Sequence, residues 1–284
     1  MPALVDTVPA KLEYCILPAD GSKPYSYVAG AQPPEGVPRS NHKSKEYVVQ
    51  IENIRGKEDS VSLDGTGFYA GRHPASHTSF KNDEEITKEY YPESVALLKQ
   101  LTGATKVVLF DHTVRRREAG DTPTLDPSSH KRGPVPQVHV DQTPEAARRR
   151  VHQNLSPEEA EERLKHRFQI INLWRPISHP AVDWPLALCD FRSVNWEKDL
   201  VPADLKFPDR DGQTFVVKYN PDHKWKYVRG LTPEELILIK CYDSIEDGSV
   251  AVLTPHTAFE DPTTPAGTPP RESIELRALV FYDN

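Results

Sequence analysis

The stretch Gln137-Val138-His139-Val140-Asp141 decides the fold that this sequence predicts, because it reads as a β-strand carrying two candidate metal ligands. Alternate side chains of a strand point to one face, so His139 and Asp141 should point together. The two valines should point the other way, into the core of a β-sandwich. A second histidine, His256, follows an apolar run much later in the chain. Two imidazoles and one carboxylate form the facial triad that holds Fe(II) with coordination positions left open.

Two further residues extend this interpretation. Arg271 and Ser273 are a basic residue and a hydroxyl at positions i and i+2 of a later predicted strand. A guanidinium binds a carboxylate through two parallel hydrogen bonds, which suits the distal carboxylate of 2-oxoglutarate. The alternative is a strand with a solvated polar face and an ordinary loop histidine at 256. The pattern predicts an oxygen-activating iron enzyme.

Composition favours a single domain built mainly of short strands. Of 284 residues, 37% are hydrophobic, and 27 prolines outnumber 14 glycines. The net charge of −7 argues against nucleic acid as a partner. No apolar window is long enough for a membrane span, and the start lacks the pattern of a secretory signal. Three widely spaced cysteines form no Cys-x-x-Cys pair, which predicts a reducing, cytoplasmic location.

The predicted organisation is an N-terminal wrapping segment, residues 1–45, followed by one domain over residues 46–284. A helix is expected over Glu85–Leu101, and two more should begin at the caps Thr143 and Ser156. About ten short strands are expected, at residues 46–52, 106–114, 137–141, 168–174, 186–194, 213–219, 224–229, 236–242, 250–254 and 273–282. This order predicts a mainly β fold with flanking helices: a double-stranded β-helix, which is the cupin-like jelly roll.

One long connection has no periodicity of its own. The polar, proline-rich stretch Glu118–Pro136 leads directly into the ligand strand. A loop of this length in a compact domain is usually a lid, a binding segment or disordered. We expect it to move over the site, with a surface loop as the alternative.

From about Glu46 to Tyr282 the chain resembles the fungal hydroxylase/desaturase family, which includes AsaB-type, gibberellin desaturase-like and cephem methoxylase-like proteins. The matching motifs occur in the expected order along the chain: Phe110-Asp-His-Thr-Val-Arg-Arg116, Val138-His-Val-Asp-Gln-Thr143, Ile171-Asn-Leu-Trp-Arg-Pro-Ile177, Pro185-Leu-Ala-Leu-Cys-Asp190, Ile239-Lys-Cys-Tyr-Asp-Ser244, Pro255-His-Thr-Ala-Phe259 and Pro270-Arg-Glu-Ser-Ile-Glu-Leu-Arg277.

The resemblance implies an Fe(II)- and 2-oxoglutarate-dependent oxygenase of secondary metabolism, with His139, Asp141 and His256 as metal ligands. Such an enzyme would use O2 and 2-oxoglutarate to form an iron-oxo species that abstracts hydrogen from a small-molecule substrate. Members of the family hydroxylate, desaturate or rearrange their substrates, so the product and the substrate stay open.

The remaining site residues are assigned less directly. Arg271 with Ser273 is the first choice for binding 2-oxoglutarate, and Arg277 is the alternative because it shares their strand face. Trp174, Arg175 and Lys240 are candidates for the substrate pocket, in competition with simple core packing.

Three rival functions remain at this point: a cupin-like binding protein, a partner subunit of a hetero-oligomer, and an iron enzyme that does not consume 2-oxoglutarate. An intact triad argues against the first. The sequence leaves open whether the protein forms a homodimer or a heterodimer.

Overall fold

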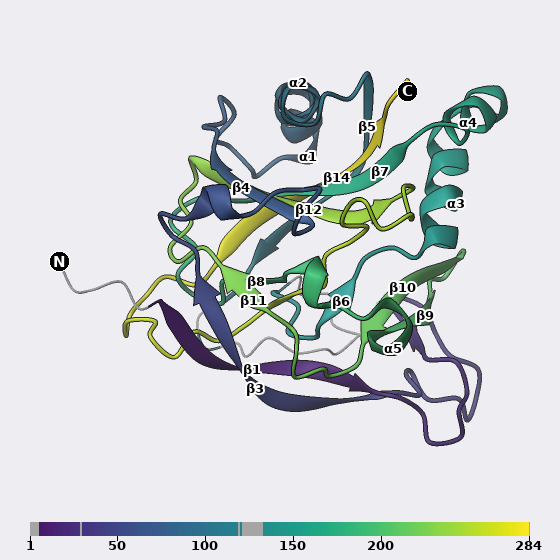
Figure 1. The fold of residues 1–284 in the computed structure, drawn as a ribbon, viewed down its shortest axis with the longest axis vertical. Coiled ribbons are helices and arrows are strands. Elements are labelled where there is room, and N and C mark those ends of the chain that lie inside the picture. Colours follow the sequence, from purple (N-terminus) through teal and green to yellow (C-terminus); the bar gives the residue numbers. More distant parts are fainter. Residues whose placement is uncertain (1–5, 29, 119, 121–132, 284) are drawn as a thin grey trace.

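The computed structural model describes residues 6–28, 30–118, 120 and 133–283, and these residues form two β-sheets that face each other (Figure 1). The larger sheet has nine strands. In order across it, they are β1 (Thr7–Ile16), β3 (Lys43–Asn53), β11 (Trp225–Tyr227), β8 (Leu186–Cys189), β13 (His256–Ala258), β6 (His139–Val140), β10 (Asp211–Val217), β9 (Leu200–Lys206) and β2 (Tyr25–Tyr27).

The smaller sheet has five strands and forms the other wall of the sandwich. Its order is β4 (Phe68–Arg72), β12 (Glu235–Asp243), β7 (Phe168–Pro176), β14 (Glu272–Phe281) and β5 (Lys106–Arg116). Every residue of β7 is buried, because the strand lies at the centre of the sheet and both of its faces are covered. Two facing sheets with flanking helices confirm the predicted mainly β, jelly-roll class.

Two apolar layers hold the five-stranded sheet in place. Between the sheets, Ile170 of β7 packs in one cluster with Leu188 of β8. On the outer face, Ile171 and Leu173 pack in a second cluster with Leu98 of the covering helix. Figure 1 shows this helix on the side of the sheet that faces away from the larger sheet.

The helices are short and lie outside the sandwich. They are α1 (Asp83–Glu85), continued by a π-helical turn (Ile86–Tyr90) into α2 (Tyr91–Thr102), then α3 (Pro144–Asn154), α4 (Pro157–Arg163) and α5 (Trp196–Asp199). The predicted caps are confirmed: Thr143 accepts a hydrogen bond from Ala146 N, and Ser156 accepts one from Glu159 N. None of the helices in the described ranges is long and apolar enough to cross a lipid bilayer.

The N-terminal segment differs from the predicted wrapping segment, because it contains two strands of the larger sheet. Strand β1 pairs with β3 over all ten of its residues, so the predicted boundary at residue 46 falls inside a strand. Burial alternates along Val8, Ala10 and Leu12. This period-2 signal was missed because prolines and charged residues surround it. The strands β4 and β9 were also missed, and residues 250–254 form no strand.

Val138 and Val140 are buried as expected, but not between the two sheets. They pack in a cluster with Leu12 of β1 and Phe215 of β10, and all strands that contribute to it belong to the larger sheet. Strands β1 and β3 pass beneath β6 in Figure 1 and cover this face. The larger sheet therefore curls over itself, and the ligand strand directs its other face at the smaller sheet.

Candidate metal centre

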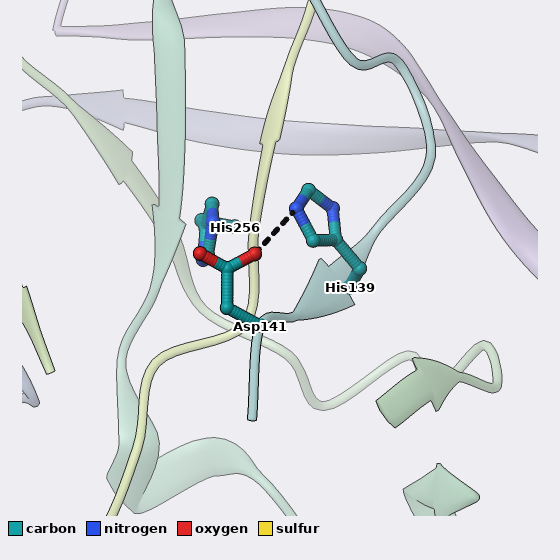
Figure 2. A group of neighbouring side chains, drawn as sticks. All are labelled: His139, Asp141 and His256. Carbon is teal, nitrogen blue, oxygen red and sulfur yellow. Dashed lines mark ion pairs between the residues drawn. The ribbon is translucent and has the colours of Figure 1, made fainter. Parts of the chain in front are cut away.

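The structure brings the three candidate ligands together from two strands of the larger sheet (Figure 2). His139 begins β6, Asp141 directly follows that strand, and His256 begins β13. The strands are antiparallel neighbours, with His139 opposite His256 in the register. One ligand atom from each of the three residues lies within 4.8 Å of the others. Within the described residues, this is the one group of at least three histidine, cysteine or acidic side chains placed to hold a metal.

The backbone fixes the tautomer of both histidines. The Nδ1 atom of His139 lies 2.7 Å from Gln137 O, and Nδ1 of His256 lies 3.0 Å from Thr254 O. A carbonyl oxygen can only accept, so each ring donates from Nδ1 and leaves the Nε2 lone pair free. Hydrogen bonds of this kind orient histidine ligands in metal proteins.

The carboxylate of Asp141 is held from its outer side. Asn172 Nδ2 donates to Asp141 Oδ2 at 2.6 Å, and Arg277 Nε lies 3.6 Å from the same oxygen. The other oxygen, Oδ1, faces Nε2 of His139 at 3.4 Å. Oδ1 and the two histidine Nε2 atoms thus form the ligand set that a metal ion would contact.

Charge at Asp141 and His256 matches the needs of a divalent cation, whereas Asp141 raises the pKa of His139 against the effect of its burial. Burial acts to raise the pKa of Asp141, but His139 and the charge of Arg277 outweigh it and hold that pKa well below its usual range. Burial and the neighbouring His139 lower the pKa of His256. An ionised carboxylate and a neutral imidazole are the protonation states in which these groups bind metal.

A cavity opens beside the three ligands. Its empty volume, including its mouth, is about 360 Å³. Besides the ligands, its lining includes Trp174, Leu186, Thr257, Arg271, Glu275 and Arg277. The cavity therefore joins the candidate metal centre to both arginines that the sequence analysis proposed for 2-oxoglutarate.

Arg271 and Ser273 carry hydrogen-bond donors without partners. The Nε atom of Arg271 and the Oγ atom of Ser273 are buried, and neither has a hydrogen-bond partner in the described part of the chain. Arg271 Nη1 donates to Trp184 O, and its guanidinium lies 5.6 Å from the centre of the Trp174 ring. Burial lowers the pKa of Arg271 to about 9, with a further contribution from the charge of Arg115.

Arg277, by contrast, already has carboxylate partners. It contacts Glu275 through Nη2 and Asp111 at 3.1 Å through Nη1, in addition to the Asp141 contact. Burial acts to lower the pKa of Arg277, but these acids outweigh it and raise that pKa above its ordinary value. Arg277 thus contacts the candidate ligand Asp141, and its charge is already matched by acids of the chain.

Of the three candidates for the substrate pocket, the structure places only Trp174 in the cavity. Arg175 points to the opposite face of β7, where Nε donates to Tyr90 OH and Nη1 donates to Pro233 O. Lys240 is fully buried, and its Nζ contacts Asp64 at 2.7 Å and Asp243 at 2.8 Å. Neither Arg175 nor Lys240 lines the cavity. Successive residues of a strand face opposite ways, so Trp174 and Arg175 could not both do so.

The sequence analysis did not identify Asn172 as a site residue. Its position inside the apolar run Ile170–Trp174 could have identified it, because an asparagine buried there needs a hydrogen-bond partner for its amide. Most of the predicted lid, Glu118–Pro136, lies outside the described residues.

The comparisons with known proteins agree with this geometry. Residues 12–281 match the family model described as an oxidoreductase/YMDC permease-like domain. The chain is 36% identical to the hydroxylase/desaturase CTB9 of Cercospora beticola, over 88% of this chain and 80% of that protein. It is 30% identical to the Fe(II)/2-oxoglutarate-dependent dioxygenase nvfI of Aspergillus novofumigatus, over 94% of each. A solved structure of the iron and α-ketoglutarate-dependent endoperoxidase NvfI superposes with a TM-score of 0.86 at 27% identity, covering 99% of this chain and 100% of that one.

Proposed function

The chain belongs to the family of fungal hydroxylase/desaturases and Fe(II)/2-oxoglutarate-dependent dioxygenases, and on that basis we propose that His139, Asp141 and His256 are its iron ligands. The protein is an Fe(II)/2-oxoglutarate-dependent dioxygenase that acts on a small molecule with O2. The predicted cofactors and the predicted class of enzyme are confirmed by these relatives. The residue assignments are our proposal.

The donor set suits Fe(II). Two neutral imidazoles and one carboxylate on one side of the ion are the arrangement that non-heme Fe(II) oxygenases use, and they leave positions open for other ligands. Asn172 and Arg277 restrain Asp141 from its outer oxygen, and so they hold the inner oxygen toward the histidines. The chain therefore supplies a preorganised face for the ion.

The unpartnered donors of the cavity suit 2-oxoglutarate. We assign its distal carboxylate to Arg271 and Ser273, because a buried donor without a partner costs about 1–3 kcal/mol and a bound carboxylate would remove that cost. No carboxylate of the described ranges lies within ion-pair distance of Arg271, which leaves the guanidinium available for a ligand. Arg277 is the poorer candidate because acids already surround it.

Bound Fe(II) and 2-oxoglutarate supply the oxygen activation and oxidising power of this class of enzyme. The chain's own residues bind and orient these groups and shield them from water. The Trp174 ring lies against the Arg271 guanidinium and would shield one side of the carboxylate site from water. His256 is itself buried, whereas His139 and Asp141 are partly exposed where the cavity opens.

The convergence of His139, Asp141 and His256 beside the unpartnered Arg271 is the observation that carries this proposal. The test is to supply Fe(II), O2 and 2-oxoglutarate and to measure succinate release with and without a panel of fungal metabolites. We expect release that depends on iron and increases with a true substrate. Substrate oxidation that proceeds without 2-oxoglutarate would instead favour an iron enzyme in which Arg271 binds the substrate.

We also propose a reducing, cytoplasmic location and a single domain that includes the N-terminal strands. The three cysteines are buried and unpaired, which supports a reducing compartment. The extensive pairing of β1 with β3 supports one folding unit.

A further inference from the structure

A second hollow reaches the candidate metal centre from another side. It lies between α3 and the hairpin of β9 and β10, and its empty volume, including its mouth, is about 390 Å³. Asp141 lines both this hollow and the cavity of Arg271. We call it the arginine groove, because Arg149, Arg150 and Arg210 are part of its lining. Leu205 and Phe207 line it as well and give it an apolar wall.

Two of the three arginines have carboxylate partners of their own. Arg149 Nη1 contacts Glu145 at 2.6 Å, and Arg210 Nη1 contacts Asp209 at 3.2 Å. Both arginines are more than one third exposed, so these pairs are ordinary surface ion pairs.

Arg150 is different. Its guanidinium lies 5.1 Å from the centre of the Phe110 ring, and the one hydrogen bond that its side chain makes within the described residues, from Nη1 to Gln153 Oε1, is long at 3.4 Å. Across the described ranges, no carboxylate lies within 4.0 Å of it, and no group accepts from its Nε or Nη2. Arg150 is only partly exposed, so it is a poorly solvated cation that lacks an anion.

The nearby acids are already neutralised by other cations. Asp211 contacts Lys206 at 2.8 Å, and both Asp141 and Asp111 contact Arg277. Burial lowers the pKa of Arg150; the charges of Arg210 and Arg277 act in the same direction, and those of Asp111 and Asp141 act in the opposite one. The groove therefore combines Arg150, a cation without a carboxylate partner among the described residues, with an apolar wall.

We propose that the substrate is an apolar molecule with a carboxylate, and that Arg150 binds this carboxylate in the arginine groove. The inference rests on the proposed function, because it uses the groove as an approach to Asp141, the one proposed iron ligand that lines it. The Nε and Nη2 donors of Arg150 form a fork that matches two carboxylate oxygens. Leu205 and Phe207 would contact the apolar skeleton, which can extend toward Asp141 and the metal. Arg150 is thus assigned as a determinant of substrate specificity.

The experiment compares an aromatic acid with its neutral amide. 2-Naphthoate and 2-naphthamide are titrated by calorimetry into the protein saturated with Fe(II) and 2-oxoglutarate without oxygen, so that the cosubstrate blocks Arg271. Arg150→Ala and Arg150→Gln are the test variants. Arg148→Ala is the matched control, because it removes the same charge from an exposed position of α3 that does not line the groove.

We expect the wild type to bind the acid about tenfold more tightly than the amide. This factor is at the lower end of the range for charge-assisted hydrogen bonds, because the contact is partly exposed to water. Both Arg150 variants should lose this preference, and Arg148→Ala should keep it. An absent preference in the wild type, an unchanged preference in the Arg150 variants, or an equal loss in Arg148→Ala would overturn the proposal.

The same titrations in metal-free protein separate this proposal from the assignment of the metal site. One result is that the protein prefers the acid through Arg150 and yet binds neither Fe(II) nor 2-oxoglutarate. That result would support the anion site at Arg150 and contradict the proposed function. If the protein binds iron and 2-oxoglutarate normally but shows no preference for the acid, the proposed function stands and the anion site is contradicted.

Discussion

Single hydrogen bonds decide which atoms of the candidate metal centre face inward. His139 and His256 each donate Nδ1–H to the carbonyl two residues earlier, so both present Nε2. Asp141 is restrained in the same way by the amide of Asn172. The sequence predicted the ligands but not these partners, because a backbone carbonyl leaves no mark in the sequence and Asn172 is distant from Asp141 along the chain.

Asn172→Ala tests the restraint on Asp141. The variant removes the donor to Asp141 Oδ2, and outer partners of this kind are typically worth about 10- to 100-fold in metal affinity. We expect a weaker Fe(II) dissociation constant in that range, measured by anaerobic titration, with the free energy of unfolding measured beside it. Gln153→Ala is a control on an amide outside the centre. Wild-type iron affinity in Asn172→Ala would show that Asp141 needs no such support.

Arg271→Lys tests the assignment of the 2-oxoglutarate site. Lysine keeps the charge but loses the planar fork, so affinity for 2-oxoglutarate should fall about 10- to 100-fold. Iron affinity should be retained, because Arg271 does not contact the ligands. Arg277→Lys is the comparison, and it should affect iron more than 2-oxoglutarate because Arg277 contacts Asp141. If Arg277→Lys loses 2-oxoglutarate while Arg271→Lys keeps it, the two roles are exchanged.

At the scale of elements, β7 separates two different environments. Its inner face carries Asn172 and Trp174 to the metal centre, and its outer face carries Arg175 to the layer under α2. The strand is buried on both faces, so the alternation of polar and apolar residues that reveals a strand's orientation is absent. For this reason the sequence could not tell which of Trp174 and Arg175 lines the cavity.

Lys240→Met tests whether Lys240 of β12 stabilises the core instead of lining the substrate pocket. Lys240 is fully buried and bonds Asp243, which is also bonded by Arg167 and Gln169. Removal of one partner from a buried ion pair lowers the free energy of unfolding by about 3–5 kcal/mol. Asp243 keeps its other partners in this variant, so we expect a loss near the lower limit. We expect that loss in urea unfolding, with unchanged affinity for Fe(II) and 2-oxoglutarate. Normal stability combined with lost substrate binding would return Lys240 to the pocket.

At the scale of the whole molecule, the sequence predicted the jelly roll and the order of its ligand strands. It did so because β5, β7, β12 and β14 are long and rich in branched apolar residues. It missed β1 and β4, where charged, glycine or proline residues weaken the pattern and only the completed sheet supplies the partners. The choice between Arg271 and Arg277 also required the folded chain, because Arg271 directly precedes β14 and Arg277 lies within it, and only the folded chain shows which acids surround each of them.

Buried histidines make the stability of the folded chain depend on pH. Burial lowers the pKa of His223, which lies between Tyr14 and Asp199, although the charge of Asp199 acts in the opposite direction. The unfolded chain, with a histidine pKa of about 6.5, takes up the proton first. The free energy of unfolding of metal-free protein should therefore fall as pH decreases below about 6.5, by at most ~1.4 kcal/mol per unit from this residue.

The measurement is urea unfolding at a series of pH values for the wild type and His223→Gln. We expect a flatter dependence in the variant. An identical slope in both proteins would assign the pH dependence to other groups.

Anaerobic equilibrium dialysis with iron, followed by metal analysis, tests whether His139, Asp141 and His256 form one Fe(II) site. The wild type should retain stoichiometric Fe(II), and His139→Ala, Asp141→Ala and His256→Ala should each lose it while remaining folded. His112→Ala is the control, because this histidine bonds Tyr91 and Asp83 outside the centre, and it should keep its iron. Full iron occupancy in any of the three ligand variants, or none in the wild type, would contradict the assignment.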